Sequence, residues 1–186
     1  MTKSKLILTI LILTSFVSFS QTDEEVKYGK IVLPVSIELI KISLWDSLVF
    51  NKVTTDFFKA LESKDTKIIK SHSLKLIHCQ LCDSKEHNLI LPLDSFINQA
   101  YNDFDTFLFE SIKKGNIRIS EMLMRGFHPK YIPNNAENDL VVFEARVMTY
   151  EPSELNDGHD GLNYCFYFVK INNEFKFFLY NTIPKS

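Results

Sequence analysis

The sequence predicts an α+β fold in which helices pack against one antiparallel sheet. Three observations predict it. The last third of the chain alternates apolar and polar residues with the period of strands. Two earlier segments repeat apolar residues every three or four positions, as amphipathic helices do. Turn residues separate all of these segments, and no internal repeat is present, so we expect a single folded domain.

Residues 1–20 have the pattern of a signal peptide. Lys3 and Lys5 form a basic start, and Leu6–Val17 is an apolar run that small residues follow. This run is shorter than the roughly 20 apolar residues of a membrane-spanning helix. We therefore expect cleavage near Ser20 and Gln21, and export to the periplasm or the extracellular space. The alternative is an uncleaved membrane anchor.

Residues 21–43 are predicted to lie outside the main domain. Residues 22–30 are polar and charged, which is typical of a leader. Ile31–Leu44 is apolar, but Pro34 interrupts it, so it is either an edge strand or an extended segment packed on the domain. The predicted organisation is a signal peptide at 1–20, a leader and unplaced extended segment at 21–43, and an α+β domain at 44–186.

The first helix of the domain is expected to start after Ser43. Ser43 and Asp46 have the spacing of a capping box, with Asp in place of the usual Glu. An apolar residue then recurs every four positions along one face, at Trp45, Val49, Val53, Phe57 and Leu61. Asp65-Thr66 begins a second, short helix, and the segment KLIHCQLC after it is a strand.

A second long helix is expected after the short strand Asn88–Leu93. Asp94 is a good N-cap, and Gly115 supplies the left-handed residue after the helix. The expected buried face consists of Phe96, Ile97, Ala100, Tyr101, Phe104, Phe107 and Leu108. A strand then starts at Asn116. It either continues by alternation, or Ser120 caps one helical turn that ends at Gly126.

Three strands close the chain. The first begins at Leu140 and alternates, with Glu144 and Arg146 on its polar face. Leu162–Ile171 is apolar on both faces, which predicts a central strand covered on both sides. Asn172-Asn173 joins it to the last strand by a two-residue turn. Because neighbours in a strand alternate, Cys165 must face away from the residues beside it.

This order of elements resembles the NTF2-like superfamily, also called the SnoaL or ketosteroid-isomerase-like fold. FFKALESKDTKIIKSHS is similar to the helical opening of such proteins, and FVKINNEFKFFLYNTIP is similar to their final hairpin. The resemblance covers Leu44–Pro184. It implies a curved antiparallel sheet that forms a cone packed on two long helices and one short helix. Members include isomerases, dehydratases and binding proteins, and no catalytic residue can be carried over to this chain.

The resemblance also implies a pocket between the long helices and the concave face of the sheet. The chain holds 16 Phe residues, and interleaved aromatic residues form a large core before they form a cavity. The aromatic residues that either line this pocket or fill it are Trp45, Phe57, Tyr101, Phe104, Phe143, Tyr164 and Phe166.

The three cysteines, Cys79, Cys82 and Cys165, are candidates for a disulfide bond, because exported proteins fold in an oxidising compartment. An odd number leaves one thiol over or implies pairing between chains. All three pairings remain open. Cys79 and Cys82 also form a C-x-x-C motif, but redox motifs of this kind lie at a helix N-terminus, and here the motif ends a predicted strand.

A metal site is a further alternative at the same place. His78, Cys79, Cys82 and His87 provide the ligand types that zinc prefers. However, His78 and Cys79 are adjacent, so on a strand they point to opposite faces. The competing interpretation is a pair of exposed histidines beside a disulfide bond.

Charge and missing motifs narrow the function. The chain has a formal net charge of −2 and no basic run, which argues against nucleic-acid binding. Phosphate loops, nucleophile elbows and H-E-x-x-H motifs are absent from the sequence.

We expect an exported, non-catalytic binding protein without a cofactor and without a membrane span after cleavage. Its partner would be a small apolar ligand in the cone pocket or an envelope protein, with a homodimer as an option. The alternatives are a pocket enzyme of isomerase or hydrolase type, or a Cys79/Cys82 redox or metal-binding protein.

Overall fold

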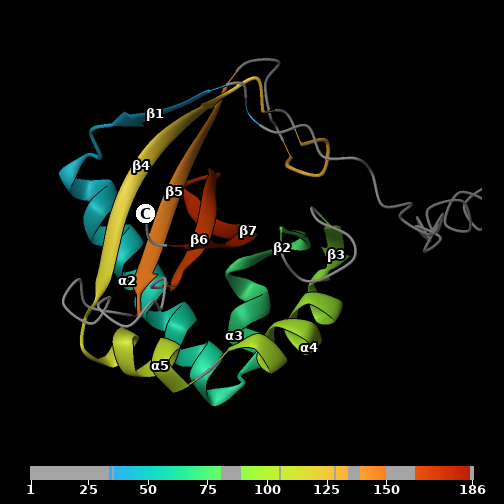
Figure 1. The fold of residues 1–186 in the computed structure, drawn as a ribbon. Helices are drawn as coiled ribbons and strands as arrows, with labels where there is room; N and C mark the ends of the chain where they lie inside the picture. The colour runs from blue at the N-terminus through green and yellow to red at the C-terminus, as the bar shows by residue number, and fades with distance from the viewer. Residues whose placement is uncertain are drawn as a thin grey trace, which may run out of the picture.

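The computed structural model describes Pro34 and residues 36–80, 89–104, 106–127, 129–133, 139–149 and 162–184 (Figure 1). The fold is α+β. The elements are, in order, β1 (Ser36–Ile40), α2 (Leu44–Ser63), α3 (Thr66–Ser71), β2 (Ser73–Cys79), β3 (Leu89–Pro92), α4 (Leu93–Asp103), α5 (Thr106–Lys113), β4 (Ile117–Arg125), β5 (Leu140–Met148), β6 (Leu162–Ile171) and β7 (Glu174–Pro184). None of the helices in this part of the chain is long and apolar enough to cross a membrane.

The strands form one seven-stranded, mostly antiparallel sheet in the order β1-β4-β5-β6-β7-β2-β3. Among the described strands, only β2 and β7 pair in parallel. The predicted central position of β6 is confirmed. β1 lies at one edge and pairs with β4, which confirms the edge-strand interpretation for residues 36–40. The sheet therefore includes a segment that precedes the predicted domain start at Leu44.

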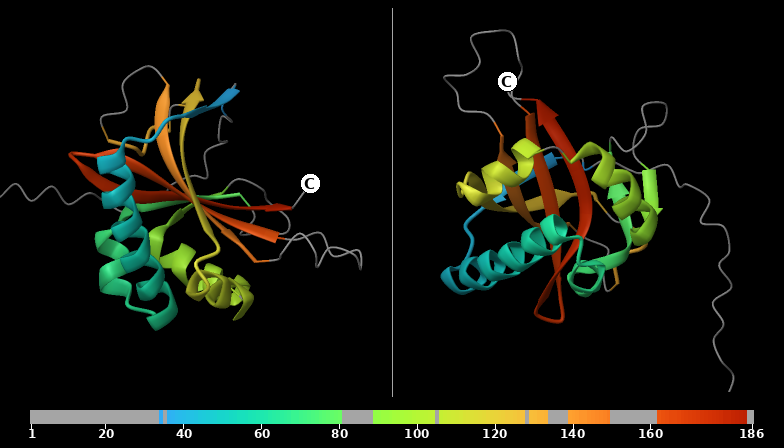
Figure 2. Two further views of the ribbon diagram at one scale, coloured as in Figure 1. Left: turned by 90° about the vertical axis from the view of Figure 1, so that its left-hand side faces the viewer. Right: turned by 90° about the horizontal axis from the view of Figure 1, so that it is seen from below.

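The described helices all lie on one face of the curved sheet, here called the inner face (Figures 1 and 2). Buried residues of α2, α3, α4 and α5 share a single hydrophobic cluster with the inward-facing residues of the sheet. A second cluster lies on the outer face. It contains no residue from these helices, and Phe127, Tyr131 and Ile132 of the segment after β4 pack there instead. The two faces are therefore covered by different kinds of structure.

Local capping explains the first two helices. The Ser43 hydroxyl accepts a hydrogen bond from the backbone N–H of Asp46 at 3.0 Å, which satisfies a free donor at the start of α2. Lys64 ends that helix in the left-handed region, at φ 58°. The Asp65 carboxylate then accepts from the N–H groups of Lys67 and Ile68, both at 3.1 Å, and starts α3. Both predicted starts are confirmed.

The prediction of a second long helix is wrong. It is divided into α4 and α5, and Phe104 between them has extended backbone angles. Asp94 lies inside the first turn of α4 and not at its N-cap, which is Pro92. The break lets the Phe104 ring contact the rings of Tyr101, Phe109, Tyr164, Phe166 and Tyr180. This packing outweighs the helical periodicity of the segment. The described helices are therefore one long helix and three shorter ones.

The strands after α5 follow the alternation of the sequence. Gly115 ends the helix at φ 74°, as predicted. β4 continues through Ser120, so the alternative of a helical turn there is wrong. Asn172 and Asn173 have φ of 50° and 64°, which are the positive values that a two-residue hairpin turn requires. Cys165 belongs to the outer cluster and the adjacent Tyr164 to the inner one, as the alternation predicts.

Candidate functional site

The interior next to the helices is packed with aromatic rings. Phe57, Phe143, Tyr164 and Phe166 are all buried there, and Tyr101 and Phe104 pack against them. The ring centroid of Phe57 lies 6.1 Å from that of Phe166 and 5.4 Å from that of Phe168. Distances of this size are typical of aromatic pairs in direct contact. Most of the aromatic residues proposed for a pocket thus contact one another and fill the core between α2 and the sheet.

Tyr101 has a specific structural contact. Its hydroxyl donates a hydrogen bond to the carbonyl oxygen of Leu61 at 3.0 Å, and so links α4 to the last turns of α2. The Lys64 ammonium group lies 5.1 Å from the centre of the Tyr101 ring. Burial raises the pKa of the Tyr101 hydroxyl, which keeps it protonated as a donor. This arrangement positions two helices.

Cys165 is a free, buried thiol, so of the three pairings left open by the sequence, the two that involve Cys165 are wrong. Cys165 lies on the outer face of the sheet, whereas Cys79 lies in the inner cluster. β7 also separates β6 from β2 in the sheet. Burial, and next the nearby Glu144 carboxylate, raise the pKa of the Cys165 thiol to about 12. A thiol in this state is a poor nucleophile.

The C-x-x-C segment lies only partly within the described residues. Cys79 is disulfide-bonded, and the remaining candidate partner, Cys82, lies outside the described residues, as does His87. His78 is buried, so the interpretation of this histidine as exposed is wrong. Across the described part of the chain, no group of three or more His, Cys, Asp or Glu residues is arranged to hold a metal ion.

A buried polar cluster lies on the outer face, where the sequence predicted an ordinary polar strand face. Glu144 of β5 is only 2% exposed. Its carboxylate accepts hydrogen bonds from the Ser120 hydroxyl at 2.9 Å and from Arg146 Nη2 at 2.9 Å and Nε at 3.3 Å. Ser120 and Tyr167 lie opposite Glu144 on the neighbouring strands. All three of these donors engage the Glu144 carboxylate within the protein, which favours a structural role over that of a general base.

A hollow at the surface lies between α2 and the β6–β7 hairpin, and we call it the α2–hairpin hollow. It has a volume of about 440 Å³ and is lined by Trp45, Asp46, Val49, Lys170, Asn173 and Phe175. A second hollow of about 280 Å³ shares Val49, Asn173 and Phe175 with it and extends toward His72 and Lys176. The two hollows are therefore neighbours, and apolar and charged side chains line both.

Charged groups border this hollow. Lys170 Nζ lies 2.6 Å from Asp46 Oδ1 and 5.7 Å from the centre of the Phe175 ring. The hydrogen bond from Lys170 lowers the pKa of the Asp46 carboxyl. Nearby, burial and then the charge of Asp46 raise the pKa of Glu121. The pKa values of Asp46 and Glu121 are thus shifted in opposite directions, because only Asp46 has Lys170 as a direct partner.

Large apolar side chains are exposed next to the hollow, on the first two turns of α2. Leu44, Trp45 and Leu48 are exposed, with Trp45 at 73% and Leu48 at 59%. Farther along the same exposed side of the helix, Lys52 and Thr55 are polar. The helical periodicity predicted Trp45 in the buried stripe, which is wrong, and it gave no sign of an exposed apolar group at Leu44 and Leu48. Their i, i+4 spacing on the polar side of the helix is the signal that could have identified them.

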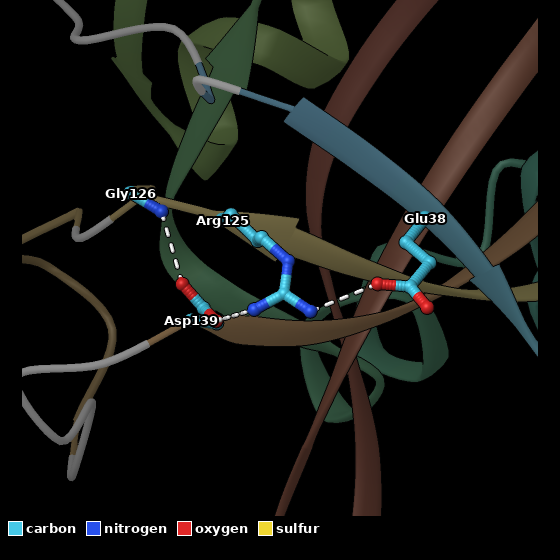
Figure 3. A network of polar contacts seen from close by, with 4 residues as sticks. All are labelled: Glu38, Arg125, Gly126 and Asp139. Carbon is cyan, nitrogen blue, oxygen red and sulfur yellow. Dashed lines mark hydrogen bonds and ion pairs between the residues drawn. The ribbon is translucent and has the colours of Figure 1, made fainter.

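A network of ion pairs fastens the edge strand to the sheet (Figure 3). Arg125 of β4 donates through Nη2 to Glu38 Oε2 of β1 and through Nη1 to Asp139 Oδ2, each at 2.9 Å. The other oxygen of Asp139 accepts from the backbone N–H of Gly126 at 3.2 Å. The groups are partly exposed, so the network contributes more to orientation than to stability.

No protein-family model and no curated protein matches the sequence. Among solved structures, the chain has a likeness to the Kfla4162 protein from Kribbella flavida, with 11% sequence identity and a TM-score of 0.37. That likeness covers 76% of this chain and 92% of the other.

Proposed function

We propose that this chain is an exported, non-catalytic binding protein of NTF2-like architecture whose partner is another envelope protein. The observation that carries the proposal is the exposed apolar group of Leu44, Trp45 and Leu48 beside the α2–hairpin hollow. Contiguous exposed apolar side chains of this size are typical of protein interaction sites. Tryptophan in particular is enriched among the residues that contribute most to binding.

Packing of the interior supports a protein partner over a small apolar ligand in a cone pocket. Rings of Phe57, Phe166 and Phe177 contact one another where such a pocket would lie. The α2–hairpin hollow, in contrast, lies at the surface and has the exposed Trp45 among its lining residues. A depression of this kind suits one or two side chains of a protein better than an enclosed molecule.

The charged groups favour binding over catalysis. A pocket enzyme needs an ionisable side chain that is held in a cavity and is available to a substrate. Asp46 at the hollow is engaged by Lys170, and Glu144 lies on the opposite face of the sheet with three donors. Neither is available as a base.

Site-specific photo-crosslinking in the native host tests this proposal. A photoreactive residue at position 48 should crosslink to one defined envelope protein, whereas the same residue at position 55, an exposed polar site on the same helix, should not. Equal crosslinking at both positions, or at neither, contradicts a partner at this surface. A small molecule that copurifies with the protein and is displaced by no variant at Leu48 would support the pocket alternative instead.

Export itself predicts two covalent features of the mature protein. The N-terminal residue should be Gln21, and peptide mapping should find Cys79 linked to Cys82 with Cys165 free. An intact Met1 in protein from the native host contradicts cleavage. A bound metal that is lost when Cys79 is replaced contradicts the disulfide and favours the metal alternative.

A further inference from the structure

The edge strand β1 offers backbone hydrogen-bonding groups on the side away from β4. It is the first strand of the sheet order, and no other described strand pairs with it on that side (Figures 1 and 2). Ile37 and Leu39 are 56% and 67% exposed. An extended edge strand with exposed apolar side chains can pair with a further strand, because its row of free N–H and C=O groups is a template for another backbone and its apolar side chains gain burial.

Within the described residues, the opposite edge of the sheet has protective features that β1 lacks. β3 has only four residues, ends in Pro92 and leads directly into α4. Short length and proline are the usual devices that prevent edge pairing. β1 has five residues without proline, and its exposed side chains include two large apolar ones. Of the two edges, β1 is therefore the one open to strand addition.

We propose that β1 pairs antiparallel with β1 of a second copy, so that one sheet runs through a two-fold symmetric dimer. Two copies of the same strand meet most completely when the two-fold axis passes through the middle residue, Glu38. In this register all five residues are paired, and a shift by two residues leaves some of them unpaired. Shifts by one residue are excluded, because they place outer-face side chains opposite inner-face ones.

The side chains agree with this register. Ile37 of each copy lies opposite Leu39 of the other, so the exposed apolar side chains of β1 cover one another as two cross-strand pairs. They extend the outer cluster, since Ile37 and Leu39 lie opposite Met124 and Met122 of β4. The two Glu38 side chains meet at the axis, and each is paired with Arg125 of its own copy, which limits their repulsion (Figure 3).

A five-residue strand pair is a small interface, so the dimer forms by mass action and depends on concentration. Sedimentation of the mature protein, from micromolar to near-millimolar concentration, should show a reversible monomer–dimer equilibrium. Over the same range, the backbone amides of residues 36–40 should exchange more slowly with deuterium, and those of β3 should not change. A monomer at all concentrations, with unchanged exchange at 36–40, overturns the proposal.

Charge at the edge should abolish pairing without unfolding the protein. The double variant Ile37→Lys/Leu39→Lys is expected to weaken the dimer by about tenfold or more, because like charges face each other across the axis. Leu48→Lys is the matched control, since it also places lysine at an exposed apolar position but away from β1. It should leave the dimer intact. Loss of the dimer in Leu48→Lys alone would overturn the β1 interface.

Oxidative crosslinking reads the register. Glu38→Cys should form a disulfide-linked dimer rapidly, because position 38 meets itself at the axis. Ser36→Cys should do so far more slowly, because residue 36 lies opposite residue 40. A faster dimer from Ser36→Cys overturns the register.

Discussion

The two faces of the sheet are buried by different kinds of contact. The inner face is covered by α2, α3, α4 and α5, and its contacts are largely between aromatic rings. The outer face is covered in part by the segment after β4, and it combines Met122, Met124 and other apolar residues with the buried Glu144 and its half-buried partner Arg146. The stability of the inner face depends on the volume of its side chains, and that of the outer face depends on satisfied polar groups. Substitutions on the two faces should therefore destabilise the protein for different reasons.

The largest expected effect is on the inner face. Phe166→Ala removes a ring that contacts Phe57, Phe58, Phe104 and Tyr180, and should lower the free energy of unfolding by about 3–5 kcal/mol. Trp45→Ala removes an even larger aromatic side chain, but an exposed one, and should cost less than about 1 kcal/mol. Urea denaturation measures both. Similar losses in the two variants would contradict the assignment of Phe166 to the core and Trp45 to the surface.

The next effect concerns the outer face. Glu144→Gln leaves Arg146 without its charge partner at a partly buried site, and should cost about 2–3 kcal/mol although the side-chain volume hardly changes. Ser120→Ala removes one hydrogen bond to the same carboxylate and should cost about 1 kcal/mol. Thermal unfolding of both variants is the measurement. A neutral Glu144→Gln would show that volume alone determines stability on this face.

A smaller effect is expected at the hollow, and it depends on pH. The pKa of Asp46 is lowered by Lys170, so the folded state gains stability from the ionised carboxyl above its unfolded pKa of about 3.9, and loses it as pH falls through the folded pKa. Asp46→Asn should therefore cost about 1 kcal/mol or less at pH 7, and progressively less as the pH falls through the folded pKa. Stability curves against pH test this. A cost that persists at pH 2 would assign the effect to helix capping.

The last prediction is that the Cys165 thiol does not react in the folded protein. Cys165 is fully buried, and its thiol pKa is raised to about 12, so iodoacetamide should leave it unmodified in the folded protein at pH 8. The same reagent should modify it fully in urea. Intact mass spectrometry reads the result. Rapid modification of the folded protein would mean that the outer face opens far more readily than the inner one.

Patterns that depend on neighbours in sequence were predictable. The caps at Ser43 and Asp65, the hairpin at Asn172-Asn173 and the opposite orientation of Cys165 and Tyr164 follow from local hydrogen bonding and from strand geometry. These features need no knowledge of what packs against them. For this reason the α+β class and the closing strands could be predicted from the sequence.

Features decided by distant contacts could not be predicted. The helical periodicity around Phe104 gives no sign that its ring meets the rings of β6 and β7, which is where the helix breaks. Alternation placed Glu144 on a polar face, but its burial depends on what covers that face. Similarly, Trp45 fits a helical stripe, and it is exposed because the stripe extends past the part of the sheet that α2 covers.

The position of β7 between β6 and β2 has a consequence for the order of folding. In the described sheet, β2 and β3 are joined to the other strands only through β7, and the pairing of β2 with β7 connects residues about a hundred positions apart. A chain that emerges from its N-terminus therefore cannot close the sheet until its last strand is available. Until then β2 and β3 have no strand through which to join the rest of the sheet, so loss of the eleven residues of β7 should divide the sheet in two rather than merely shorten it.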